Sequence, residues 1–271
     1  MNKKKILKIT LSTLILLIFI ALGFIGNYFY NLALNPNTSK DIVFGTPEEA
    51  ESTSGQVLDE DKTWLLSESN YSDEYITSSD NLKLHSYKIQ NEVPSNKWAI
   101  TVHGYTSEGL NMSTYAKKYY DMGYNVLIPD LRAHGLSDGD YIGMGWDDRL
   151  DIISWIDVIL NENPDAEIVL HGVSMGAATV TMTSGEELPS NIKLDDLFSL
   201  PEFPIMHVSS LVAQIRAGYS LGEASSIEQV KKSKTPILYI HGDQDDFVPY
   251  FMMEELYKAT NSEKEMLTIE G

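Results

Sequence analysis

Ser174 is the residue of this chain best placed to act as a nucleophile. Residues 172–176 read GVSMG, a match to the G-x-S-x-G pattern, between a strand-like run (IVLH) and a run of small residues typical of a helix. A turn this sharp has room only for glycine at Gly172 and Gly176, and it exposes the serine at the carboxyl edge of a sheet. The helix N-terminus behind it favours developing negative charge. The pattern predicts a nucleophilic serine, with a structural Gly-Ser turn as the alternative.

Three other segments rich in glycine and polar residues follow strand-like runs. They read HGYT at 103–106, PDLRAHGLSDG at 129–139 and HGDQDDFVP at 241–249. In the G-x-S-x-G context, a loop after an earlier strand supplies the second backbone N–H of an oxyanion hole. Residues 103–106 are the candidates for that loop, and we interpret His103 as a residue that structures it.

The elements that must position these segments alternate between strand and helix patterns. From about Tyr71, the runs EYIT and LKLHSYKI predict a hairpin, and residues 147–163 carry apolar residues at helical spacing. Strand-like and helix-like runs then follow each other to a last strand, EMLTI. This alternation predicts an α/β fold with a mostly parallel sheet covered by helices on both faces.

The order of these motifs resembles the α/β-hydrolase superfamily. It is most similar to the bacterial membrane-anchored or cell-surface serine hydrolases of the serine-aminopeptidase and monoacylglycerol-lipase branch. The resemblance covers about residues 71–271. It implies a mostly parallel α/β-hydrolase sheet with a small helical cap over about 195–233.

The resemblance also implies roles for single residues. Ser174 would be the nucleophile, and the backbone N–H groups of Met175 and Tyr105 would form the oxyanion hole. Asp245 would be the acid of the catalytic triad, from the H-G-x-x-D-x-x-V-P motif that ends at Pro249. Its neighbours Asp243 and Asp246 are competitors, but the spacing to Val-Pro selects Asp245. The resemblance gives Asp130, Arg132 and His134 structural roles in loops near the site.

Two features depart from the family pattern. The triad histidine of the family follows the last strand, and no histidine follows His241 in this sequence. His207, in the predicted cap, could reach Ser174 only by an unusual path. A central strand also looks absent, since only residues 192–194 could start one before the cap. We therefore interpret the sequence as a fragment or shortened form of a normal hydrolase, lacking one central strand and the C-terminal end of the domain.

The N-terminus predicts a membrane anchor. Four lysines precede an apolar run from about Ile9 to Tyr30, which has about the 20 residues needed to cross a bilayer. A cleaved signal is the alternative, but its apolar region is usually shorter and the cleavage site near Ala33 is poor. We predict an anchor over 1–34 and a linker or stalk over 35–70 with a short helix near Trp64. The lysines would stay in the cytoplasm and the hydrolase domain would lie outside the cell.

Composition limits the remaining classes of function. The 271 residues carry a formal net charge of −19 and no cysteine, so disulfides and thiolate metal sites are excluded. The acidic surface disfavours nucleic acid as a partner. No pattern indicates a metal site or requires a cofactor. We expect a small-molecule ester or peptide substrate and a lipid bilayer as partners. The alternatives are an inactive surface binding protein and an acyltransferase.

Overall fold

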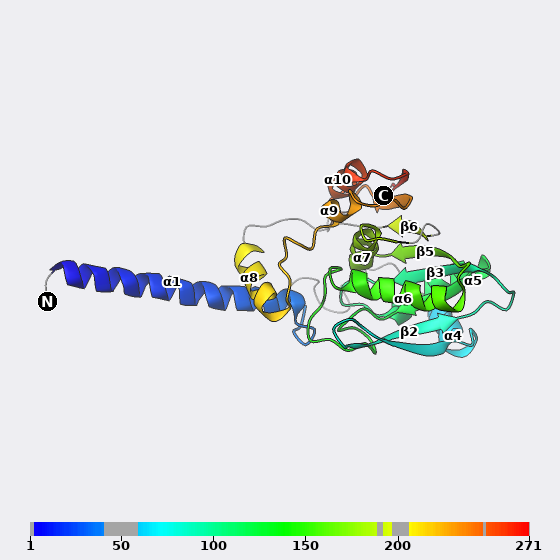
Figure 1. The fold of residues 1–271 in the computed structure, drawn as a ribbon, viewed down its shortest axis with the longest axis horizontal. Helices are drawn as coiled ribbons and strands as arrows, with labels where there is room; N and C mark the ends of the chain where they lie inside the picture. Colours follow the sequence, from blue (N-terminus) through cyan, green and yellow to red (C-terminus); the bar gives the residue numbers. More distant parts are fainter. Residues whose placement is uncertain (1–2, 41–58, 189–191, 197–205, 246–247, 271) are drawn as a thin grey trace.

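The computed structural model describes residues 3–40, 59–188, 192–196, 206–245 and 248–270. Its main body is built around a single sheet, and a long N-terminal helix projects from one side of that body (Figure 1). The sheet has the strand order β1-β2-β4-β3-β5-β6-β7-β8. The strands are β1 (Ser72–Thr77), β2 (Lys83–Ile89), β3 (Lys97–Val102), β4 (Asn125–Pro129), β5 (Glu167–Gly172), β6 (Ile192–Asp196), β7 (Ile237–Gly242) and β8 (Lys264–Ile269).

The sheet is mixed, with its antiparallel pairs at one edge. β1 pairs antiparallel with β2 and β2 with β4, whereas the pairs from β4 through β3, β5, β6 and β7 to β8 are all parallel. The predicted hairpin is β1 and β2, and the predicted mostly parallel sheet is confirmed. The carboxyl ends of β3, β5 and β7 meet at one edge, where the loops that carry the candidate site residues begin.

The prediction that a central strand is missing is wrong. Ile192–Asp196 forms β6, which pairs in parallel with both β5 and β7. The strand has only five residues. Its backbone hydrogen bonds with two neighbouring strands hold it in the sheet, and so short a run of side chains carries little pattern of its own. The absence of the C-terminal end of the domain stays a prediction.

Helices pack on both faces of the sheet, as the sequence predicts. They are α4 (Asp59–Ser67), the 3-10 helix η1 (Gly109–Met112), α5 (Ser113–Asp121), α6 (Asp148–Glu162), α7 (Met175–Ser184), α9 (Ser226–Val230) and α10 (Phe251–Ala259). Alternate residues of β4 belong to two separate cores: Leu127 packs in the core that includes α6 and α7, and Val126 and Ile128 pack in the core that includes α4 and α5. The helix at α4 confirms the one predicted near Trp64.

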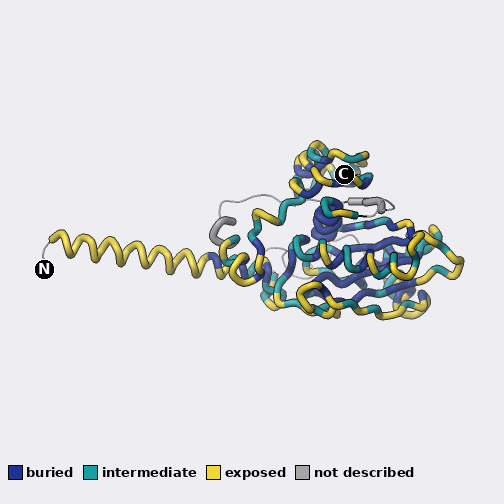
Figure 2. The backbone as a smooth tube through the Cα atoms, in the orientation of Figure 1, coloured by how far each residue is buried: buried dark blue, intermediate teal, exposed yellow. Residues whose placement is uncertain are grey.

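The N-terminal helix α1 (Lys3–Leu34) is exposed along most of its length and enters the body of the protein at its C-terminal end (Figure 2). Within the described residues it is the one helix long and apolar enough to cross a membrane. Its buried residues are Gly26, Tyr30 and Leu34. There α1 packs against α8 (Met206–Arg216), which lies in the region predicted as the cap.

Candidate active site

The backbone at Ser174 is held in a conformation that L-amino acids rarely adopt. Ser174 has φ 56° and ψ −119°, and it lies between the end of β5 and the start of α7. Its side chain is exposed, while the residues of α7 behind it are buried. Such strain is maintained only when the surrounding structure enforces it, and it concentrates at functional sites. The turn therefore presents the serine as the sequence predicts.

The turn over residues 172–176, called the elbow below, has room only for glycine at Gly172 and Gly176. A Cβ on Gly172 would lie 2.3 Å from the carbonyl oxygen of Gly176, and a Cβ on Gly176 would lie 2.2 Å from the carbonyl oxygen of Val102. Both distances are far below van der Waals contact. The chain can turn from β5 into α7 against the end of β3 only because these positions carry no side chain.

The loop after β3 lies directly against the serine. A Cβ on Gly104 would be 3.2 Å from Ser174 Cβ and 3.7 Å from Ser174 Oγ. Thr106 has a positive φ of 57°, and the N–H of Ser107 donates to the carbonyl of Gly104 over 3.2 Å, which closes a tight turn. Tyr105 is thus held in the middle of a turn beside Ser174. Met175, on the other side, is the first residue of α7, where backbone N–H groups lack helical acceptors.

Asp245 lies in the loop after β7. Its Oδ1 accepts the N–H of Val248 over 2.7 Å, and its Oδ2 is 3.9 Å from Nε2 of His241. β7 is two strands from β5, which is roughly 10 Å across a sheet. A third group must therefore link this carboxylate to Ser174. Of the two competitors, Asp243 is exposed and Asp246 lies outside the described residues.

The described imidazoles have partners other than Ser174. His103 uses both ring nitrogens in its own neighbourhood, Nδ1 with the carbonyl of Gly104 at 2.8 Å and Nε2 with the N–H of Leu131 at 3.0 Å. His241 Nε2 lies 3.0 Å from the carbonyl of Val248. No described histidine forms a hydrogen bond with Ser174.

Burial also keeps two of these imidazoles neutral. It lowers the pKa of His103 to about 3 and the pKa of His171 to about 4. The bonds of His103 to Gly104 and Leu131 agree with the predicted role of this residue in structuring the loop. The side chain of His207, on α8, lies outside the described part of the chain.

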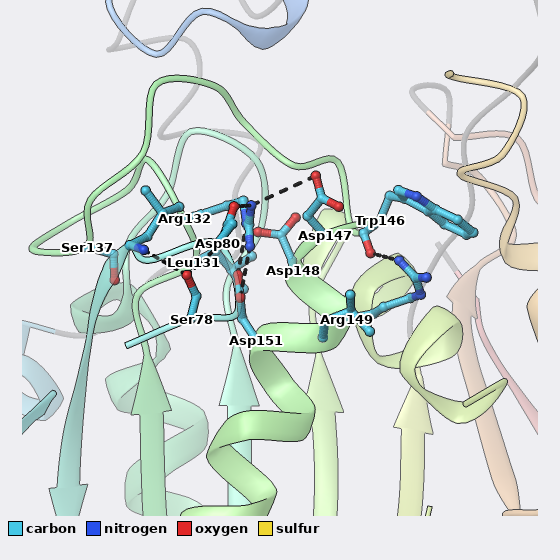
Figure 3. Close-up of polar contacts among 12 residues, drawn as sticks. Ser78, Asp80, Leu131, Arg132, Ser137, Trp146, Asp147, Asp148, Arg149 and Asp151 are labelled. Atoms are coloured by element: carbon cyan, nitrogen blue, oxygen red, sulfur yellow. Dashed lines mark hydrogen bonds and ion pairs between the residues drawn. The ribbon is translucent and has the colours of Figure 1, made fainter. Parts of the chain in front are cut away.

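Arg132 organises the loop after β4 through ion pairs (Figure 3). Its Nε and Nη2 each lie 2.9 Å from the carboxylate of Asp151 on α6, and its Nη1 lies 2.9 Å from Asp80. Burial on its own lowers the pKa of Arg132, but the bond to Asp151 and the nearby carboxylates outweigh burial and raise it, so the guanidinium stays charged. The cluster ties the β1–β2 turn, the β4 loop and α6 together, the structural role that the resemblance implies.

Comparison with known proteins agrees with this geometry. The sequence profile of the family described as serine aminopeptidase, S33, matches residues 94–197, which include the β3 loop and the elbow. The fold is similar to that of the esterase Pf2001 of Pyrococcus furiosus, with a TM-score of 0.58 and 25% identity over 80% of this chain and 88% of that one. The chain therefore has the α/β-hydrolase fold and is similar to the α/β-hydrolase superfamily.

Proteins similar to this chain include two from Bacillus subtilis. The uncharacterized protein YqkD is 28% identical over 193 residues, which cover 64% of this chain and 63% of YqkD. The putative esterase YitV is 24% identical over 205 residues, which cover 66% of this chain and 80% of YitV. The chain therefore spans less than two thirds of the length of YqkD.

The structure has a cavity of about 450 Å³ beside the β3 loop. Its lining comes from the chain that leaves α1, the β3 loop and the β4 loop, and it includes Pro36, Lys40, Thr106, Ser107, His134 and Ile142. Ser174 is not among the described residues that line it. The cavity meets the candidate site through the turn that carries Tyr105.

Sequence reasoning identified the elbow and the two loops beside it but missed two contacts. It did not predict that Gly104 would press against Ser174, and it did not predict that the end of α1 would lie against the β3 loop. The first had a signal, because a glycine after a buried strand permits close backbone approach. The second joins residues more than 70 positions apart, and no local pattern encodes it.

Proposed function

We propose that this hydrolase cleaves carboxylic esters, and less readily amides or peptides, through an acyl intermediate on Ser174. The observation that carries the proposal is the strained, exposed conformation of Ser174 between Gly172 and Gly176, with the Gly104 backbone against it. A buried or relaxed serine in a turn needs none of these features. YitV is described as a putative esterase and the Pyrococcus furiosus protein as an esterase, which supports the ester over the amide.

The proposed reaction has two steps. Ser174 Oγ attacks the carbonyl carbon of the substrate and gives its proton to a base, and the backbone N–H groups of Met175 and Tyr105 stabilise the oxyanion. Collapse of the tetrahedral intermediate releases the alcohol, which takes up that proton. Water then attacks the acyl-serine by the same route and frees the acid. Asp245 orients the base and stabilises its positive charge.

The family order places the base, a histidine, after the strand that corresponds to β8, and the residues that the structure describes supply none there. The ends of β7 and β8 are adjacent: Gly242 pairs with Ile269, and the N–H of Asp243 donates to the carbonyl of Ile269 over 3.0 Å. A residue just beyond β8 would therefore emerge beside the loop of Asp245. Because β8 is the outer neighbour of β7, the chain beyond it would have to turn back over the carboxyl edge of the sheet to reach Ser174.

The proposal places the hydrolase on a membrane. α1 serves as a single anchor with its lysines in the cytoplasm, and the body of the protein, which includes α4, acts outside the cell. The charge asymmetry supports this direction, because Lys3, Lys4, Lys5 and Lys8 all precede the apolar run. A cleaved signal at the same place remains the competing interpretation of α1.

A second function is favoured by one observation: no described histidine hydrogen-bonds with Ser174. Without a base the serine would not be activated, and the fold would then serve as an inactive surface protein that binds a ligand or partner. Only the weak catalysis of an oxyanion hole would remain.

The test is covalent labelling of the full chain by a fluorophosphonate probe, with Ser174→Ala as the control. The proposal expects labelling of the wild-type protein and none of Ser174→Ala. The intact mass of the native protein from its membrane fraction accompanies the test. A mass well above 30.4 kDa identifies further sequence that could carry the base. An unlabelled protein with a mass of 30.4 kDa would favour the inactive binding protein instead.

A further inference from the structure

The C-terminal end of α1 is built into the domain beside the candidate site. A helix leaves its last four backbone carbonyls without helical partners. In α1 these are the carbonyls of residues 31–34, and each accepts a hydrogen bond from another part of the chain. A helix that only anchored a domain through a loose tether would leave such groups to water.

Three donors from different places satisfy these carbonyls. Lys40 Nζ donates to the carbonyls of Leu32 at 2.6 Å and Asn31 at 3.4 Å. The Tyr105 hydroxyl donates to the carbonyl of Ala33 at 2.6 Å. The backbone N–H of Ile142 donates to the carbonyl of Leu34 at 2.8 Å. The positive charge of Lys40 also lies at the negative end of the helix dipole.

Side-chain packing adds to these hydrogen bonds, and the C-terminal end of α1 over residues 27–34, with its contacts to the rest of the chain, is called the dock below. Tyr30 and Leu34 are 3% and 1% exposed, and they pack with Ala213, Ala217 and Tyr219 in and just after α8. The remaining contacts come from Arg216, whose guanidinium lies 4.0 Å from the ring centroid of Tyr30 and donates to the side-chain oxygens of Asn27 and Asn31, each over 3.1 Å. The dock therefore joins the anchor, the cap region and the β3 loop.

Tyr105 is the residue that connects this dock to the nucleophile. Its backbone lies in the turn beside Ser174, whereas its hydroxyl is bonded to α1. We propose that the docked end of α1 is a positioning element of the active site, which acts through the Tyr105 side chain to hold the β3 loop in its catalytic conformation. This inference rests on the proposed function, because it assigns the loop an oxyanion-binding role.

The physical reason is that the loop contains a strained turn, which the bond to the Tyr105 hydroxyl holds together with the bonds of Ser107 and His103 to Gly104. Thr106 has a positive φ, so its turn is strained and needs contacts that enforce it. An oxyanion donor contributes only when it is aimed at the developing charge, and a misplacement of about 1 Å can lower a rate on the order of 100-fold. The hydrogen bond from the Tyr105 hydroxyl to Ala33 helps to hold Tyr105 in place, and in the proposed function the backbone N–H of Tyr105 must point at the oxyanion.

The test compares Tyr105→Phe with Tyr28→Phe in the full chain in detergent micelles. Tyr28 lies on α1, and its side chain is exposed. Two readouts are taken: the maximal rate and the half-saturating concentration of fluorophosphonate labelling, and hydrogen exchange in peptides covering 31–35 and 103–108. Lys40→Met is a second variant, which removes the bonds of Lys40 to Asn31 and Leu32 and replaces no residue of the loop. Lys40 Nζ lies 5.9 Å from the ring centroid of Tyr105.

We expect Tyr105→Phe to lower the maximal labelling rate about tenfold, the effect of one net hydrogen bond, with an unchanged half-saturating concentration. Both peptides should exchange faster in Tyr105→Phe and in Lys40→Met, and Tyr28→Phe should behave as the wild type. Wild-type rates and exchange in both dock variants would overturn the inference.

The two proposals fail in different ways. If the wild-type protein is not labelled at Ser174, the proposed function fails, and the exchange measurement alone decides the inference. Faster exchange at 103–108 in Lys40→Met would then support a coupling between dock and loop, because Lys40 is not part of that loop. Unchanged exchange at 103–108 in Lys40→Met would contradict that coupling and overturn the inference.

Discussion

His85 Nδ1 lies 2.7 Å from Asp130 Oδ2, although 45 residues separate them in the chain. His85 is fully buried, and its other ring nitrogen is 3.0 Å from Asp73. Asp130 also accepts the backbone N–H groups of Gly109 at 2.7 Å and Leu136 at 3.0 Å. The pair therefore fixes the loop after β4 to β2 and to the helix that begins at Gly109, under the candidate site.

His85→Gln should destabilise the protein by about 3 kcal/mol, because it removes one partner of a buried charged pair. Burial alone lowers the pKa of His85, but Asp130 and Asp73 outweigh it and raise the pKa above its usual 6.5. Its stabilising contribution is therefore complete below about pH 6.5 and is lost as the pH rises through the folded-state pKa.

The contribution of Asp130 to stability depends on pH in the opposite direction. Burial raises its pKa, but the bonds from His85, Leu136 and Gly109 outweigh burial and lower it below 3.8. That contribution is lost as the pH falls through the folded-state pKa. Guanidinium unfolding followed by tryptophan fluorescence should give the largest difference between wild type and His85→Gln near pH 5.5, with a smaller difference at pH 9. Equal differences at both pH values would contradict this account.

Gly176→Ala should destabilise the elbow by about 1–3 kcal/mol or prevent folding, because the added Cβ would lie 2.2 Å from the carbonyl oxygen of Val102. Gly222→Ala is the matched control, since a Cβ there meets no atom within 4 Å. It should change the free energy of unfolding by less than about 0.5 kcal/mol. Thermal unfolding of the two variants side by side measures the difference, and similar losses would show that the elbow tolerates a side chain.

Ser174→Gly should be more stable than Ser174→Ala by about 1 kcal/mol. Alanine keeps the strain of φ 56° and ψ −119°, whereas glycine adopts these angles freely. At most exposed sites the order is reversed, because glycine gains more conformational freedom on unfolding. Denaturant midpoints of the two variants test the sign, and a more stable alanine variant would mean that the elbow stores no strain.

Asp148→Asn should remove a pH-dependent loss of stability. Burial raises the pKa of Asp148 from 3.8 to about 6, even though Arg132 and the N–H of Gly145 favour its ionised form. The folded state therefore holds this proton more tightly than the unfolded state, and stability falls as the pH rises from about 4 to 6. The full cost above that range is on the order of 3 kcal/mol. Unfolding titrations at pH 4 and 7 should show a flatter profile for Asp148→Asn, and parallel profiles would contradict the assignment.

The sequence alone determined the features that arise from short stretches of chain. The alternation of strand and helix patterns predicted the parallel sheet with helices on both faces, and GVSMG predicted the turn from β5 into α7. These signals are local, because side-chain periodicity and the space available at Gly172 and Gly176 are properties of a few neighbouring residues.

Only the tertiary structure decided the features that depend on distant partners. β6 has five residues, and it was predicted to be missing because its place depends on the backbones of β5 and β7. The bond from Tyr105 to Ala33 joins the β3 loop to a helix 72 residues earlier. Local periodicity carries no record of which carbonyl a hydroxyl will reach, because that distance is set by how the whole chain packs.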